Sequence, residues 1–268
     1  MTDWMKRDNS AVITGGASGI GLAAAKRFLE TGMRVLIADL SEEALAEAAS
    51  ALPATGEWFT QRCDVSDFDQ VSALQQSARE RLGDIHCLMN NAGAALPPST
   101  PWENLDTWKK QVDVNLWGII HGCQAFIPGM LDSGVRGAII NTGSKQGITN
   151  PPGGYAYNLS KAGVKAYTES LAHALRQLED CRLSAHLLIP GFTYPGMIAR
   201  FMPEKPAGAW TAEQVVAFML EAVDRGDFYV LCPDNDTPRS LDEKRIQWHT
   251  DDIILNRPAL SRWDPEHQ

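Results

Sequence analysis

Three side chains near the middle of the chain have the types and the spacing needed to move a proton. Tyr157 and Lys161 are four residues apart, so a helix would place both on one face. Ser144 lies thirteen residues before Tyr157. A phenol with a pKa near 10 is a poor acid–base catalyst at neutral pH, but a nearby ammonium group favours the phenolate. The spacing therefore predicts that Tyr157 exchanges a proton with a substrate. Tyr155 is excluded because Leu159, and no lysine, stands one turn after it.

A glycine-rich run lies upstream of these residues. Its glycines are spaced Gly-x-x-x-Gly-x-Gly, at Gly15, Gly19 and Gly21. The run follows an expected strand over residues 11–14 and opens an expected helix over residues 20–30. Glycines in that context permit a tight turn and let the backbone approach a pyrophosphate at the start of the helix. Together with the proton-transfer residues, the run indicates hydride chemistry with a dinucleotide.

The elements that must position these residues alternate along the chain. We expect strands at residues 11–14, 35–38, 58–61, 85–89, 137–141, 184–189 and 228–231. We expect helices at residues 20–30, 42–51, 69–81, 105–131, 157–179 and 212–224. The strands are short continuous apolar runs, which is typical of parallel strands buried on both faces. This alternation predicts an α/β fold, a doubly wound parallel sheet of about seven strands flanked by helices.

Length and composition limit the class of protein. The 268 residues suit one large α/β domain, and 44% hydrophobic with 21% charged residues suits a globular core. The net charge of −9 argues against nucleic acid or an anionic membrane as partner. No apolar run reaches the roughly 18 residues of a membrane span, and residues 1–10 hold no secretory signal. The five cysteines form no Cys-x-x-Cys pair. We therefore expect a cytoplasmic protein with reduced, mostly buried thiols and no metal site.

Taken together, these motifs resemble those of the classical short-chain dehydrogenase/reductase family, whose glycine loop reads Thr-Gly-x-x-x-Gly-x-Gly. Thr14 and the three glycines match that loop residue by residue. Further similar segments are Asp64-Val65, Asn90-Asn91-Ala92-Gly93, Asn115 and Pro190-Gly191. A Tyr-x-x-x-Lys pair alone also fits a core tyrosine beside a solvated lysine, but here all the motifs stand in register. The resemblance implies a Rossmann fold and an NAD(P)-dependent oxidoreductase that interconverts a secondary alcohol and a ketone.

The resemblance also implies a role for each catalytic residue. Tyr157 takes the alcohol proton while a hydride passes to the nicotinamide, and returns it in reduction. Ser144 hydrogen-bonds the substrate oxygen. Lys161 lowers the pKa of Tyr157 and binds the nicotinamide ribose. Asn115 distorts its helix and completes a proton relay through water to Lys161; its alternative is a solvent-facing asparagine. The implied cofactor-binding residues are Thr14, Gly15, Ser18, Gly19, Ile20, Gly21, Asp39, Asp64, Val65, Asn91, Ala92, Gly93, Tyr157, Lys161, Pro190, Gly191 and Thr193.

Asp39 favours NAD over NADP. It ends the second expected strand, eighteen residues after Gly21. A carboxylate there can accept hydrogen bonds from the adenosine ribose and would repel a 2′-phosphate. Ser18 stands where NADP-preferring relatives often carry Arg or Lys, and it offers no cation. Asp39 could instead cap the helix expected at residues 42–51, although Ser41 is the better cap candidate.

Residues 191–210 form a long connection that should select the substrate. The expected substrate-binding residues are Ser144, Gln146, Tyr157, Phe192, Tyr194 and Met197. Their apolar and aromatic character favours a hydrophobic or aromatic alcohol, unless these side chains only pack the loop itself. The family's threonine that contacts the nicotinamide carboxamide is replaced by Pro195, and Thr193 is the substitute candidate. Sugar, steroid and hydroxyacyl substrates also remain open.

The last segment, residues 233–268, is a C-terminal extension with three readings: a packed extension, a subunit contact or a loosely ordered tail. The helices expected at residues 105–131 and 157–179 resemble the pair that joins subunits in this family, which implies a homodimer or homotetramer. A fold alone does not establish activity, so a noncatalytic NAD(H)-binding sensor or scaffold is the main alternative. Epimerases and dehydratases of similar fold usually have longer chains.

Overall fold

Seven parallel strands form the central sheet of the computed structural model, which describes residues 4–98, 100–194 and 204–267. The strands are β1 (Ser10–Thr14), β2 (Arg34–Asp39), β3 (Trp58–Arg62), β4 (Cys87–Asn90), β5 (Gly137–Thr142), β6 (Leu183–Ile189) and β9 (Tyr229–Leu231). Their order is β3-β2-β1-β4-β5-β6-β9. Successive strands are added on one side of β1 up to β3 and on its other side from β4 onward. Doubly wound sheets bind ligands at this switch point between β1 and β4. The predicted fold class is confirmed.

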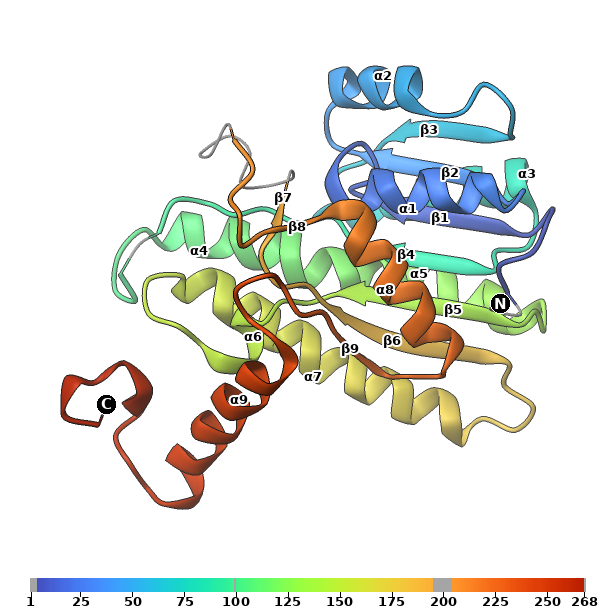
Figure 1. Cartoon of the computed structure of the whole chain (residues 1–268). Coiled ribbons are helices and arrows are strands. Elements are labelled where there is room, and N and C mark those ends of the chain that lie inside the picture. The colour runs from blue at the N-terminus through green and yellow to red at the C-terminus, as the bar shows by residue number, and fades with distance from the viewer. Residues whose placement is uncertain (1–3, 99, 195–203, 268) are drawn as a thin grey trace.

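Helices cover both faces of the sheet (Figure 1). One face packs against α1 (Gly19–Glu30), α2 (Glu42–Ala51) and α8 (Ala212–Asp224). The other packs against α3 (Phe68–Leu82), α5 (Gly118–Asp132) and α7 (Tyr155–Gln177). Side chains alternate between the faces, since Ile13 and Ile37 join the first core whereas Val12 and Leu36 join the second. This burial on both faces explains why the strands read as continuous apolar runs.

The expected helix over residues 105–131 is interrupted, which corrects that prediction. It consists of α4 (Leu105–Val112), a π-helical turn at Asp113–Trp117 and α5. The π-helical turn has Asn115 at its centre, so the helix distortion expected at this residue is present. Such turns widen a helix by one residue per turn and often occur at functional sites. The helix expected to begin at Tyr157 begins two residues earlier, after Gly154.

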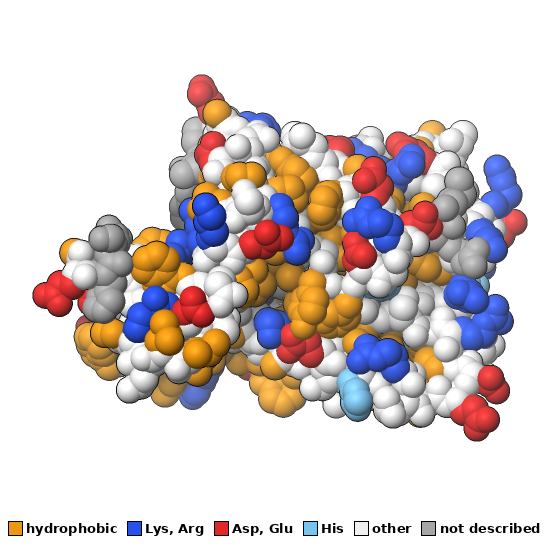
Figure 2. All heavy atoms as spheres, turned by 60° about the horizontal axis from the view of Figure 1, so that its bottom comes forward, with side chains coloured by type: hydrophobic (Ala, Val, Ile, Leu, Met, Phe, Trp, Pro, Cys, Tyr) orange, Lys and Arg blue, Asp and Glu red, His pale blue; other side chains and the backbone are white. Residues whose placement is uncertain are grey.

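Three segments have more structure than the sequence predicted. Short strands β7 (Thr193–Tyr194) and β8 (Trp210–Thr211) pair at the two ends of the connection 191–210, and α6 (Gln146–Thr149) follows β5. The C-terminal extension forms α9 (Arg239–Ile254) and two 3-10 turns, so a loosely ordered tail is the wrong reading. It projects from the body as an arm (Figure 1). Hydrophobic side chains lie on its surface (Figure 2). Ile253, Ile254 and Leu255, at and just after the end of α9, are exposed.

The cysteines are free, and four of the five are buried. Burial raises the pKa of Cys63 to about 11 and that of Cys123 to about 12, so both stay protonated at neutral pH. They pack as small hydrophobic residues, as expected. Within the described ranges, no helix combines the length and apolar character that crossing a bilayer requires.

Candidate active site

Ser144, Tyr157 and Lys161 meet where β5 ends and α7 begins. Ser144 lies two residues beyond the end of β5, and its side chain shares a hydrogen bond with that of Tyr157. The Lys161 ammonium nitrogen lies 5.8 Å from the centre of the Tyr157 ring. It also donates a 2.8 Å hydrogen bond to the carbonyl oxygen of Thr142, the last residue of β5. One strand end therefore positions both the serine and the lysine around the phenol.

Burial dominates the electrostatics of the pair. Lys161 is 2% exposed, and burial lowers its pKa from 10.5 to about 8. Burial also raises the pKa of Tyr157, and the hydrogen bond with Ser144 only partly opposes this. In the chain by itself, Tyr157 is thus a protonated phenol at neutral pH. A lowered pKa of Tyr157 therefore needs a further positive charge in the cleft, and the lowering effect of Lys161 stays a prediction.

The Asn115 amide is bound to neighbouring protein groups. Its Oδ1 accepts from the Ala94 N–H at 2.7 Å, and its Nδ2 donates to the Ala94 carbonyl at 3.0 Å and to Ser160 Oγ at 3.3 Å. A methyl group added at Gly93 would lie 3.4 Å from Asn115 Oδ1 and 3.7 Å from Lys161 Nζ. The amide, the glycine and the ammonium therefore surround one small space beyond β4. Asn115 is buried, which rules out the solvent-facing alternative.

The glycine-rich loop lies directly against the segment after β4. Gly15 has φ +61°, and a Cβ there would lie 2.7 Å from Ala92 Cα. Thr14 Oγ1 accepts from the Asn91 N–H at 3.1 Å and the Ala92 N–H at 3.2 Å, and Asn91 Nδ2 donates to the Gly15 carbonyl at 3.1 Å. A Cβ at Gly21 would collide with that same carbonyl. The loop requires glycine at these positions because backbone meets backbone.

Asp39 lies at the end of β2, beside the loop. Its Oδ2 accepts from the Ala17 N–H at 3.2 Å and its Oδ1 from the Leu40 N–H at 2.8 Å. Ser41, not Asp39, caps α2 by accepting from the Ala44 N–H. Asp39 is half-buried, and each carboxylate oxygen can accept a second hydrogen bond. Its carboxylate is therefore available to a ligand at the start of α1, where Ser18, Gly19 and Ile20 lie.

Asp64 and Val65, which are expected at the adenine, both contact neighbouring residues of the protein. Asp64 Oδ1 accepts from the main-chain N–H and the hydroxyl of Ser66, at 3.0 and 2.6 Å. Val65 is buried, and a Cβ at Gly118 would lie 2.6 Å from its Cγ2. These contacts shape the turn after β3 and close α5 onto it. The adenine contact of Asp64 and Val65 stays a prediction.

The expected substrate residues are only partly gathered. Gln146 is exposed at the start of α6, and Phe192 and Tyr194 flank Thr193 at the beginning of the connection 191–210. Thr193 Oγ1 donates to the carbonyl of Gly191, which follows the buried Pro190, at 3.1 Å. Met197 and Pro195 lie outside the described residues. The carboxamide contact of Thr193 therefore stays a prediction.

Sequence reasoning missed a buried charge cluster beside Ser144. The Lys145 ammonium lies 3.3 Å from Asp234 Oδ2 and 2.7 Å from Asp242 Oδ2. Lys145 directly follows Ser144, but its two partners are far along the chain, in the C-terminal extension. The adjacency to Ser144 was the only available signal.

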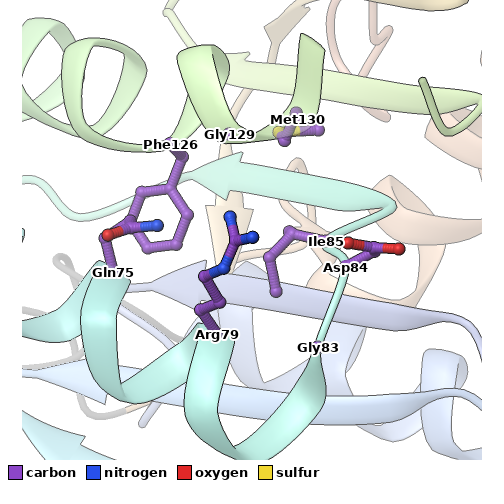
Figure 3. Close-up of a pocket in the computed structure, with 8 residues that line it drawn as sticks. All are labelled: Gln75, Arg79, Gly83, Asp84, Ile85, Phe126, Gly129 and Met130. Carbon is purple, nitrogen blue, oxygen red and sulfur yellow. The ribbon is translucent and has the colours of Figure 1, made fainter. Parts of the chain in front are cut away.

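A shallow hollow lies elsewhere, between α3 and α5 (Figure 3). Its lining includes Asp84 and Ile85, which precede β4, whereas Asn91 follows β4. Because the strands are parallel, the hollow is at the opposite end of the sheet from Ser144 and Tyr157. We assign the site by its side chains and not by this hollow.

Comparison with known proteins agrees with this geometry. The model of the short chain dehydrogenase family matches residues 9–205. The chain belongs to the short-chain dehydrogenase/reductase family. It is 35% identical to a 1-deoxy-11-beta-hydroxypentalenate dehydrogenase of Streptomyces arenae, over 87% of this chain and 84% of the relative. It is 32% identical to an NADP-dependent (R)-specific alcohol dehydrogenase of Lentilactobacillus kefiri, over 78% and 80% of the two chains.

A solved structure extends the family likeness to nearly the whole chain. The short-chain dehydrogenase/reductase of Burkholderia phymatum in complex with NAD superposes with a TM-score of 0.85. It is 31% identical and covers 95% of this chain and 96% of its own. The short-chain dehydrogenase/reductase fold thus includes residues beyond position 205, where the family model stops.

Proposed function

We propose that this short-chain dehydrogenase/reductase is an NAD-dependent oxidoreductase that interconverts a secondary alcohol and a ketone, with Tyr157 as general acid and base. The convergence of Ser144, Tyr157 and Lys161 at the end of β5 carries the proposal. The dehydrogenase names of its relatives support the reaction class. Fold alone would not, because the same fold can bind a cofactor without turnover.

The residues around the glycine-rich loop suit a dinucleotide. Gly15 and Gly21 let the loop pack directly against Ala92 and Asn91, which supports the tight turn that a pyrophosphate-binding loop requires. The start of α1, with Ser18, Gly19 and Ile20, would hold the pyrophosphate. Asp39 would hold the adenosine ribose, and Asp64 and Val65 would border the adenine. Gly93, Pro190, Gly191 and Thr193 would border the nicotinamide. When bound, NAD supplies the acceptor or donor of the hydride.

Asp39 is the basis for proposing NAD and not NADP. Its carboxylate accepts a hydrogen bond from the loop residue Ala17, and this closeness to the loop supports a contact with the adenosine ribose. A 2′-phosphate there would be repelled, and Ser18 carries no compensating charge. The relatives differ in this respect, since one is named NADP-dependent and a solved neighbour contains NAD. In this chain, we assign the choice to Asp39 and Ser18.

The side chains move one proton. In oxidation, Tyr157 Oη accepts the alcohol proton, and in reduction it returns the proton to the carbonyl oxygen. Ser144 hydrogen-bonds that substrate oxygen and stabilises its developing charge. Lowering a phenol pKa from about 10 to about 7 requires roughly 4 kcal/mol. In the chain by itself, burial outweighs the groups that lower the pKa of Tyr157, and this pKa stays raised. We infer that the reactive phenolate forms only when the positively charged cofactor is bound.

Lys161 and Asn115 would support this proton transfer. Lys161 would bind the nicotinamide ribose while its hydrogen bond to Thr142 fixes its position. Asn115 would keep the relay open by holding Ala94 and the π-helical turn in place. A relay water would then lie beside Lys161, where Gly93 has no side chain.

The remaining proposals concern the substrate, the assembly and the location of the protein. Phe192, 36% exposed beside the site, supports a hydrophobic or aromatic substrate.

Trp117 on the π-helical turn and Leu159 on α7 are exposed by 48% and 54%, which supports a homodimer or homotetramer through these helices. The free, buried cysteines support a cytoplasmic location.

A turnover screen tests the proposal. The chain is incubated with secondary alcohols, such as 1-phenylethanol and its ring-substituted analogues, and with NAD or NADP. Formation of the reduced nicotinamide is followed by absorbance. We expect turnover with NAD. Binding of NADH without turnover of any alcohol or ketone would instead identify a noncatalytic sensor.

A further inference from the structure

A buried charge cluster joins the strand end that carries Ser144 to the C-terminal extension. Lys145, whose side chain is 16% exposed, lies between Asp234 and Asp242, whose side chains are each 5% exposed. Burial alone would raise the pKa of Asp234, but the Phe192 N–H and the charge of Lys145 hold it below its usual value. Burial raises the pKa of Asp242, against the influence of Lys145. Lys145 therefore forms ion pairs with both carboxylates, of which Asp234 is the one that also accepts from the Phe192 N–H.

Asp234 also contacts the start of the substrate-binding connection 191–210. Its Oδ2 accepts from the Phe192 N–H at 3.1 Å. A Cβ at Gly191 would lie 2.5 Å from this Oδ2 and 3.1 Å from Lys145 Nζ, so only glycine fits between them. A carboxylate that accepts a main-chain N–H and pairs with a buried ammonium is held more rigidly than either contact alone would hold it.

The next residue contacts the other end of the same connection. Asn235 Nδ2 donates to the carbonyls of Ala207 and Ala209 at 2.7 and 3.3 Å, and the Asn235 N–H donates to the Gly208 carbonyl at 3.0 Å. The two ends also meet directly, because the Trp210 N–H donates to the Phe192 carbonyl at 2.8 Å. Asp234 and Asn235 thus hold both ends of the connection from one short segment.

We propose that Asp234 is a positioning residue that sets the two described ends of the substrate-binding connection, residues 191–194 and 204–210, against the strand end carrying Ser144, acting through Lys145 and Phe192. The C-terminal extension is then part of the substrate site. This inference rests on the proposed function, because the connection selects a substrate only if the chain turns one over. Asp234 does not touch the reacting atoms, so its loss should weaken substrate binding more than it slows the proton transfer.

The first test compares Asp234→Asn with Asp252→Asn. Asp252 is a matched control, because it is equally a buried carboxylate of the extension, but its ion pair with Arg257 at 3.0 Å and its hydrogen bonds with Ser261 stay within the extension. For 1-phenylethanol or the ring-substituted analogue oxidised fastest, we expect Asp234→Asn to raise KM about tenfold and to change kcat less than about threefold. NADH affinity should be unchanged. Asp252→Asn should leave KM unchanged although it destabilises the arm.

A second measurement needs no turnover. Hydrogen exchange of the segments 187–194 and 204–211 should be faster in Asp234→Asn and unchanged in Asp252→Asn, because only the first loses the charged acceptor of the Phe192 N–H. A wild-type chain that binds NADH without turnover would refute the proposed function, while the exchange result would still decide the positioning role.

Lys145 provides an independent pair of variants. Lys145→Met should raise KM as Asp234→Asn does. Lys145→Arg should keep KM near the wild-type value, because arginine keeps the positive charge between the two carboxylates. The inference is overturned if Asp234→Asn changes neither KM nor exchange, or if Asp252→Asn changes both to the same extent. It is also overturned if Lys145→Met leaves KM at the wild-type value.

Discussion

Lys161 holds its ammonium nitrogen 5.8 Å from the centre of the Tyr157 ring, in a place almost closed to water. This relationship joins the chemistry of the site to the stability of the fold. An ammonium that is only 2% exposed loses hydration, and its pKa falls to about 8. The chain keeps it there through a hydrogen bond to the Thr142 carbonyl. The site therefore carries a cost in stability that its function explains.

The first prediction concerns the stability of Lys161→Met as a function of pH. In the unfolded chain the lysine keeps its ordinary pKa of 10.5, so between about pH 8 and 10.5 the unfolded chain binds more protons than the folded one. The wild type therefore gains stability over this window as the pH rises, by about 3 kcal/mol in total. Methionine has no such dependence. The free energy of unfolding of the variant minus that of the wild type should fall by this amount.

Urea unfolding of both proteins at pH 7, 8, 9 and 10 measures that difference. The titrations of other groups cancel because they are common to both chains. A difference that stays constant across this range would show that the pKa of Lys161 in the folded chain is not lowered by burial.

The second prediction concerns Gly15, whose φ of +61° and close approach to Ala92 act together. Gly15→Ala should destabilise the fold and abolish NADH binding, because its Cβ would lie 2.7 Å from Ala92 Cα. Gly134→Ala is the control, since Gly134 has φ +64° and nothing within 4 Å of its added Cβ. It should cost only the left-handed conformation, about 1–2 kcal/mol, and leave NADH binding intact.

Thermal unfolding and NADH fluorescence titration distinguish the two variants. If Gly15→Ala binds NADH as tightly as Gly134→Ala does, the glycine-rich loop is not the dinucleotide site.

The third prediction concerns the choice of cofactor. The wild type should favour NAD over NADP in kcat/KM by about tenfold or more, because the Asp39 carboxylate repels a 2′-phosphate. Asp39→Asn removes the charge, keeps the shape and should reduce that ratio by about tenfold. Glu42→Gln, an exposed acid in the first turn of α2, should leave the ratio unchanged. A wild-type preference for NADP would contradict the role of Asp39.

The sequence was sufficient for the parts of the fold that repeat a local pattern. Each of the seven expected strands overlaps its observed strand, because parallel strands buried on both faces leave continuous apolar runs. Ser41 caps α2 as its sequence predicts, since cap chemistry is local. The proximity of Ser144, Tyr157 and Lys161 was predictable from the spacing of their motifs, although a sequence alone shows no contact between side chains.

The parts that depend on distant contacts were not predictable in the same way. The π-helical turn at Asp113–Trp117 lies where the Asn115 amide binds the main chain of Ala94. The α9 helix has no clear apolar stripe, so its sequence did not distinguish it from a tail. The partners of Lys145 are 89 and 97 residues away, and only the folded chain brings them together.

The most direct test of the account is the rate of NADH formation from NAD and a secondary alcohol in the pair Tyr157→Phe and Tyr155→Phe. Both variants remove one hydroxyl from the first turn of α7, but only Tyr157 shares a hydrogen bond with Ser144. Tyr157→Phe should lose turnover by about 10²–10⁴-fold or more, while NADH binding persists, and Tyr155→Phe should keep it. Near-normal turnover by Tyr157→Phe would contradict the assignment of Tyr157 as the general acid and base.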